Sequence, residues 1–326
     1  MAPPCESDAA RLWTSLAWGP RACAEPPAVP WVSMSQTAVP PLKPASIAAP
    51  FAALAAGAVA MGASPIFVRL ADVGPFASAF WRVALALPVL YVWMRVSERG
   101  GATTAFSRAT IWAGLAFTGD LFFWHLSIVT TSVANATFFA TTAPIWVVLF
   151  GWLLFRIRPT RGVVAGLALC IAGGGALLAQ SFHLRPAGAL GDFYGLVTGV
   201  FFGLYFLAVR AARAQSSAAR VTFEATLITA ALLLVAALAL EGAILPHGVN
   251  GVADLVALAW ISHAGGQGLL AVALGRLPAA FSSLVIFLEA IAAALFAWAL
   301  LGEPVSAVQA LGGLAILAGI YVARSA

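Results

Sequence analysis

Ionisable and polar side chains in the middle of long apolar stretches are the residues of this sequence that could do chemistry. Asp120 lies in "FTGDLFFWH", His263 and Gln267 lie in "WISHAGGQGLL", and Glu289 lies in "VIFLEAIAA". Apolar surroundings can raise the pKa of a carboxyl group by several units, so that it exchanges protons near neutral pH or binds a cationic solute. A helix-packing hydrogen bond is the structural alternative for each residue.

Two further groups of residues could contribute to such a site. Arg82 could bind a carboxylate or another anion, or it could reach the membrane surface or brace a neighbouring helix through backbone carbonyls. Asn135 could line a pore or cap a helix. An apolar pocket for amphipathic substrates could be formed by Trp124, Phe138, Tyr205 and Trp260.

The composition indicates what kind of element holds these residues. Of the 326 residues, 62% are hydrophobic and only 9% are charged, whereas soluble domains carry about 25% charged residues. The net charge of +5 comes from arginines between apolar segments, which indicates membrane topology and not nucleic-acid binding. No phosphate-binding loop and no metal-ligand spacing is present, so we expect no cofactor and no metal.

Ten apolar runs of about 20 residues are each long enough to cross the membrane as a helix, and their continuity excludes alternating strands. The fold class predicted is an all-α integral membrane protein. The expected spans are 47–70, 76–96, 109–130, 132–155, 161–181, 190–211, 221–241, 252–274, 279–301 and 305–323.

The distribution of basic residues predicts the orientation of these spans. With the N-terminus inside, 14 of the 17 lysines and arginines lie in the N-terminal tail, the even-numbered loops and the C-terminus. Arg69 and Arg185 are the two on the opposite side, and Arg82 lies within a span. The positive-inside rule therefore places both termini in the cytoplasm.

The chain also contains an internal repeat. "LLFRIRPTRGVVAGL" at 153–167 corresponds to "LLGEPVSAVQALGGL" at 300–314, and Gly166 and Gly173 correspond to Gly312 and Gly319. Five spans separate the two copies, so the second is inverted, and its turn, with Glu303, faces outward without arginines. We predict an inverted 5+5 repeat with a binding site near the midplane, where Asp120 meets His263, Gln267 and Glu289.

Several segments resemble the EamA family of the drug/metabolite transporter superfamily. They are "FWRVALALPVL", "TSVANATFFATTAPIWVVLFGWLLF", "GDFYGLVTGVFFGLYFLAVR" and "SLVIFLEAIAAALFAWALLGEPVSAVQALGGLAILAGIYV". The resemblance implies a ten-helix secondary transporter, often an exporter, with repeats at 46–181 and 190–324. Because the family keeps Arg82 across many substrates, we favour the bracing role for it. "FLEA" keeps Glu289 but lacks the family's usual proline, so the resemblance alone does not decide whether the helix is kinked there.

These observations predict a secondary active exporter of small organic metabolites, such as amino acids or drugs, that works by alternating access in the plasma membrane. Expected partners are the small-molecule substrate, the lipid bilayer, protons as coupling ion, and a second copy of the chain in a homodimer. We expect no enzymatic activity; the alternatives are an intramembrane enzyme acting on a lipid or peptide, and a passive channel.

The first 45 residues differ from the rest because they are rich in proline and contain no span. We interpret them as a disordered cytoplasmic tail. The alternative is a true start at Met34, with the preceding residues outside the natural protein.

Overall fold

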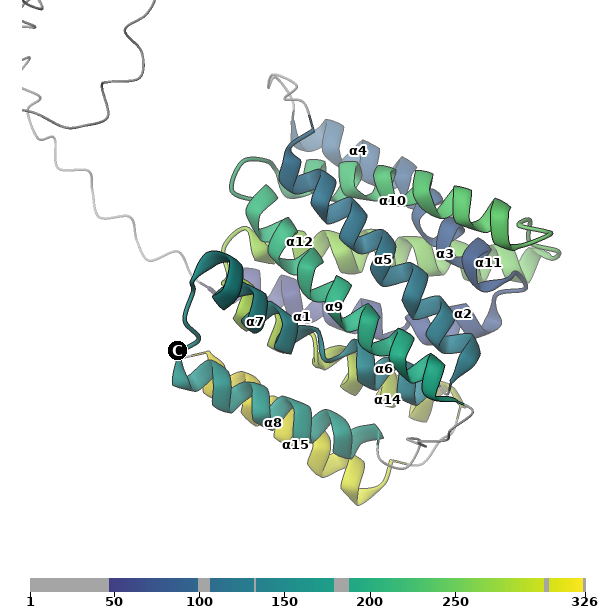
Figure 1. Ribbon diagram of the computed structural model, residues 1–326. Coiled ribbons are helices and arrows are strands. Elements are labelled where there is room, and N and C mark those ends of the chain that lie inside the picture. The colour runs from purple at the N-terminus through teal and green to yellow at the C-terminus, as the bar shows by residue number, and fades with distance from the viewer. Residues whose placement is uncertain (1–46, 99–105, 132, 179–187, 302–304, 325–326) are drawn as a thin grey trace, which may run out of the picture. The chain divides into compact units, whose positions relative to one another are not determined.

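The computed structural model describes residues 47–98, 106–131, 133–178, 188–301 and 305–324, and every regular element in these ranges is a helix. The tail 1–45 and Glu303 lie outside the described residues. The helices are α1 (Ala48–Gly62), α2 (Ser64–Leu70), α3 (Pro75–Ala84), α4 (Leu87–Ser97), α5 (Arg108–Thr130), α6 (Val133–Ala140), α7 (Ala143–Phe155), α8 (Arg161–Leu178), α9 (Ala189–Ala212), α10 (Ala218–Leu240), α11 (Val249–Ala257), the π-helix η2 (Leu258–Gln267), α12 (Gly268–Leu274), α13 (Ala279–Val285), α14 (Leu288–Leu301) and α15 (Ala307–Ala323) (Figure 1).

Eight helices or joined helices in the described ranges are long and apolar enough to span a membrane. Two shorter apolar helices, Arg161–Leu177 and Ala307–Ala323, coincide with the fifth and tenth predicted spans. The surface agrees with this assignment, because Trp112, Leu154 and Val235 are each more than 60% exposed. A lipid-facing exterior explains exposed apolar side chains of this size, so the chain is a multi-pass membrane protein.

Four of the predicted spans are interrupted near their middle. The first is divided at Ala63, before a helix that has Pro65 in its first turn. The second is divided between α3 and α4, and α4 likewise has a proline in its first turn. The fourth is divided between α6 and α7, where Pro144 begins the second part. Proline lacks the N–H that would continue the hydrogen-bond ladder, which favours a break at these places.

The ninth span is divided as well, between α13 and α14, although it lacks proline. The amides of Phe287, Glu289 and Ala290 donate to carbonyls three residues earlier, at 3.1, 2.8 and 3.1 Å. This tighter turn replaces the regular α-helical pattern. The backbone therefore turns at "FLEA" without the proline that the family usually has there.

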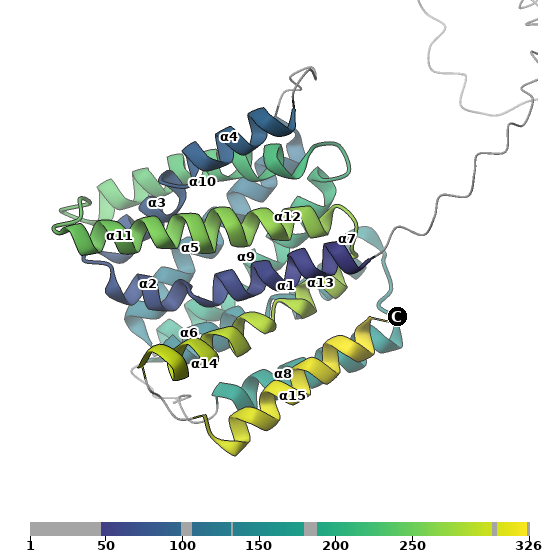
Figure 2. The ribbon, with the colours of Figure 1, turned by 180° about the vertical axis from the view of Figure 1, so that it is seen from behind.

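The four glycines of the repeat lie in the contact between α8 and α15, which run side by side (Figures 1 and 2), but each glycine faces the counterpart of the other one. A Cβ on Gly166 would lie 2.5 Å from the carbonyl oxygen of Gly319, and one on Gly173 would lie 2.5 Å from that of Gly312. Gly166 thus faces Gly319 and Gly173 faces Gly312, so residue numbers rise along α8 where they fall along α15. The two helices are therefore antiparallel. Only glycine allows the two backbones to approach so closely.

The small-residue motif of the sixth span, Gly195, Gly199 and Gly203, also lies in a helix contact. Added Cβ atoms would lie 2.9 Å from the Cβ of Phe139, 2.4 Å from Oγ1 of Thr142 and 2.7 Å from the Cβ of Trp146, respectively. The motif thus packs α9 against α6 and α7, as expected for close helix contact.

Helix α10 is fastened at both ends to the second span. At one end, the carboxylate of Glu241 accepts hydrogen bonds from the backbone amides of Phe76 and Ala77, at 2.7 and 2.9 Å. At the other end, the guanidinium of Arg220 binds Glu98 and also lies 3.3 Å from Glu224, one turn further along α10. These contacts hold α10 and the second span together as a unit.

Replacing Glu241 by alanine should lower the free energy of unfolding by about 1 kcal/mol, because the first amides of α3 lose their acceptor. Thermal unfolding of the purified protein would measure the change. Asp254→Ala is the matched control, since the Asp254 side chain makes no hydrogen bond or ion pair with the described residues. Equal losses in both variants would contradict the capping role.

Stability should also depend on pH through Glu98, which lies just beyond the end of α4. The hydrogen bond from Arg220 lowers the pKa of Glu98 below its ordinary value of 4.5. This contribution is therefore present above pH 4.5 and is lost as the pH falls through the folded-state pKa. Melting temperatures above and below pH 4.5 should differ less in Glu98→Gln than in the wild type. Identical pH profiles would show that the ion pair does not stabilise the fold.

Candidate functional site

A small polar cavity of about 50 Å³ lies where the broken helices meet. Its walls come from the breaks of the first, fourth and ninth spans, the end of α3, the end of the π-helix η2, and the middle of α5 and α9. The lining residues are Met61, Ser64, Arg82, Asp120, Leu121, Trp124, Thr137, Ala140, Thr141, Thr198, Phe202, Gln267, Ile286 and Glu289. Interrupted helices free backbone groups and side chains for binding at membrane depth.

The charged groups of the cavity are one guanidinium and two carboxyl groups. Arg82 is 5% exposed, Asp120 is 8% exposed, and both Asp120 and Glu289 are within electrostatic range of Arg82. The guanidinium carbon lies 5.7 Å from the ring centroid of Trp124, a cation–π contact. Neither ion pair found in the described ranges includes Arg82.

Arg82 keeps hydrogen-bonding capacity for a ligand. Its Nε is buried without a hydrogen-bond partner among the described residues. The bracing through backbone carbonyls that we favoured is not observed within those residues. Gln267 also has an unsatisfied polar atom. Its Nε2 lies 3.2 Å from the sulfur of Met61, but its Oε1 is buried without a hydrogen-bond partner among the described residues. A buried unpaired polar atom is costly unless something satisfies it, so these atoms make the cavity the candidate binding site.

Five of the ten residues predicted for the site line this cavity: Arg82, Asp120, Trp124, Gln267 and Glu289. Two others lie beside it without lining it. His263 contacts the hydroxyl of Thr226 at 2.9 Å through Nε2, and its ring packs against Phe117. Tyr205 is buried and packs against the same Phe117, with ring centroids 4.7 Å apart.

The remaining three predicted residues lie elsewhere. Asn135 donates to the carboxylate of Asp192 at 2.8 Å and joins α6 to α9. Phe138 packs against Phe139 at a centroid distance of 5.5 Å. Trp260 is 53% exposed, and its indole N–H donates to the carbonyl of Leu85. None of the three lines the cavity.

Sequence reasoning missed the small polar residues of the cavity. Ser64, Thr137, Thr141 and Thr198 all line it. Three of them stand at or near a helix break, where Thr141 donates to the carbonyl of Phe138 at 2.7 Å. Threonines next to a proline inside an apolar run, as in "TFFATTAP", are the signal that could have identified the fourth span's contribution.

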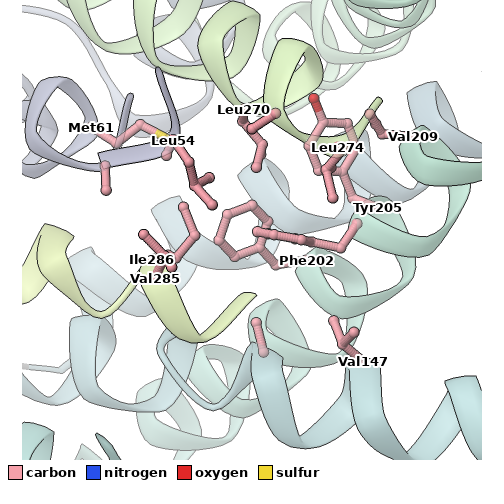
Figure 3. Close-up of a cluster of buried hydrophobic side chains, with 14 of the residues drawn as sticks. Leu54, Met61, Val147, Phe202, Tyr205, Val209, Leu270, Leu274, Val285 and Ile286 are labelled. Atoms are coloured by element: carbon pink, nitrogen blue, oxygen red, sulfur yellow. The ribbon is translucent and has the colours of Figure 1, made fainter. Parts of the chain in front are cut away.

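Buried apolar side chains form a cluster next to the cavity (Figure 3). They lie one or two turns from cavity residues, toward the end of the bundle where α9 and α12 end. Leu274 and Leu54 are fully buried there, and Tyr205 and Val209 are nearly so. We call this the inner plug; its labelled members are Leu54, Val147, Tyr205, Val209, Leu270, Leu274 and Val285.

The architecture can now be compared with known proteins. The model of the EamA-like transporter family matches residues 49–178 and again residues 189–325. The chain belongs to this family. The resemblance seen in the sequence is thereby confirmed, and both matched stretches contribute to the cavity of this EamA-like transporter.

Further comparisons concern the fold alone. No curated protein matches the chain. Several solved structures do, and one crystal structure of a protein has 18% sequence identity and a TM-score of 0.75. The match covers 86% of this chain and 98% of that chain, so the two share their fold over nearly the whole of the solved structure.

Proposed function

We propose that this EamA-like transporter is a secondary active exporter of small organic metabolites in the plasma membrane. It has ten membrane helices in an inverted 5+5 repeat, 46–181 and 190–324, with both termini in the cytoplasm. The observation that carries the proposal is the polar cavity at the helix breaks, closed on one side by the inner plug. A central site open to one side at a time is what alternating access requires.

Helix contacts support the inverted repeat. Helix α5 packs on α9, and its counterparts η2 and α12 pack on α1. Likewise α6 and α7 pack on α9, while α14, and to a smaller extent α13, pack on α1. Each contact of the first half thus has an equivalent in which the two halves exchange roles. The antiparallel contact between α8 and α15 is its own equivalent, as a two-fold axis in the membrane plane requires.

The position of the inner plug is evidence for an alternating-access transport cycle. It lies at the end of the bundle that carries Arg156, Arg213 and Arg276, which the positive-inside rule places in the cytoplasm. The described state is then closed toward the cytoplasm. Rocking of the halves would separate the plug, admit solute from inside and exchange it for a proton on Asp120 or Glu289.

Quantitative metabolite profiling of medium and cytoplasm tests the proposal. Cells would express the wild type, Asp120→Asn or an empty vector. A solute enriched in the medium only with the wild type supports export through the cavity. No difference among the three cultures contradicts export of a host metabolite.

Proton coupling needs its own test in proteoliposomes loaded with the solute that profiling identifies. If Asp120→Asn and Glu289→Gln both transport normally and still respond to a pH gradient, coupling through these carboxyl groups is wrong.

A further inference from the structure

Two apolar grooves run over the same part of α9, away from the central cavity. One, of about 370 Å³, lies between α7, α9 and the start of α13; the other, of about 500 Å³, lies between α5, α7 and α9. They share the lining residues Phe155, Leu207 and Ala211. Trp112 and Leu154 in the second groove are 67% and 64% exposed, so that groove opens on the outer surface of the bundle.

Arginines stand at one end of both grooves. Arg210 lines the first groove. Arg108 directly precedes the lining residue Ala109, and Arg156 directly follows the shared Phe155. No acidic side chain lines either groove. An apolar channel that ends in cations on the side of the basic loops matches a molecule with an apolar tail and an anionic head.

The arginines near the end of α9 are held in place by backbone carbonyls. Arg210 donates to the carbonyl of Leu274 at 3.0 Å, and Arg213 donates to that of Ala271 at 2.8 Å. Burial, and then the charges of Arg210 and Arg276, lower the pKa of Arg213. Neither ion pair in the described ranges involves these arginines. Their like charges repel one another, and a bound anion would relieve that repulsion.

Arg156 provides a second, independent observation. Its φ of 55° is the only positive value at a non-glycine residue in the part of the chain that the structure describes. It occupies the left-handed position after α7, where helices usually place glycine. Strain retained at one residue points to a role for its side chain.

We propose that the two grooves bind an anionic phospholipid of the leaflet on the arginine side. The acyl chains occupy the grooves along α9, and Arg108, Arg156 and Arg210 bind the phosphate-bearing headgroup. The lipid then contacts α5, α7 and α9 together, at the end of the bundle where the inner plug closes the pathway.

Native mass spectrometry of the purified full-length protein tests this, with phosphatidylglycerol and phosphatidylcholine of identical acyl chains as probes. The wild type should prefer phosphatidylglycerol, and Arg210→Gln should weaken its binding about fivefold without affecting phosphatidylcholine. Ala211→Trp, which fills both grooves and leaves the charge unchanged, should weaken both lipids. Arg69→Gln, at the opposite end of the bundle, is the control and should change neither.

Arg156→Gly is a second variant for the case in which Arg210→Gln or Ala211→Trp does not fold. It should raise the melting temperature, because glycine tolerates the left-handed position, and it should still weaken phosphatidylglycerol binding about fivefold. The proposal is overturned by equal binding of the two lipids in the wild type, or by an effect of Arg69→Gln as large as that of Arg210→Gln. Displacement of the lipid by free glycerol 3-phosphate at equal concentration overturns it as well, since that marks a site for free anions.

Discussion

Replacing Arg82 by leucine is expected to reduce the initial rate of transport by about a hundredfold or more. Arg82 is the only cation among the described residues that line the cavity, and it stands near the carboxyl groups of Asp120 and Glu289. Losing a buried charge contact to a bound ligand costs about 2–5 kcal/mol of binding free energy, which corresponds to roughly thirtyfold to several thousandfold. The measurement is solute flux into proteoliposomes, normalised to the amount of folded protein.

Two companion variants separate binding from structural support. Arg82→Lys keeps the positive charge but loses the planar fork, and we expect a smaller loss, of about tenfold. If Arg82 acts mainly by neutralising Asp120, then adding Asp120→Asn to Arg82→Leu should restore folding but not transport. Wild-type flux in Arg82→Leu would show that the cavity does not use this cation.

The second large effect is expected at the contact between α8 and α15. A Cβ on Gly312 would lie 2.6 Å from the carbonyl oxygen of Gly173 and 2.7 Å from the amide nitrogen of Leu177. Both are backbone atoms of a facing helix, so no side chain can rotate to make room. Gly312→Ala should therefore destabilise the protein by about 1–3 kcal/mol, measured by thermal unfolding in detergent.

The next residue provides a matched control. A Cβ on Gly313 would meet only the side chain of Ile291, at 4.0 Å. Gly313→Ala should be neutral or stabilising by up to about 1 kcal/mol, because alanine favours the helix. Similar melting temperatures for Gly312→Ala and Gly313→Ala would contradict the close backbone contact.

Much of the site was predictable because charges inside apolar runs are rare. Arg82, Asp120, Gln267 and Glu289 stood out against their neighbours and all line the cavity. Aromatic residues gave no such contrast, since a membrane helix also uses them to face lipid. Of the four aromatics chosen from the sequence, Trp124 lines the cavity, whereas Trp260 faces outward.

The sequence by itself determined that this chain is a multi-pass helical membrane protein that resembles the EamA family, and that Gly166 and Gly173 recur as Gly312 and Gly319. The membrane class follows from composition and run length, and the family resemblance follows from the segments quoted above; all of these are properties of the linear sequence. Only the tertiary structure decided where the helices break and which polar groups meet, such as the break before Glu289 without proline and the binding of Asn135 to Asp192. The reason is physical: a helix break depends on neighbouring helices that satisfy its freed backbone groups, and a polar side chain bonds to whichever partner packing brings near.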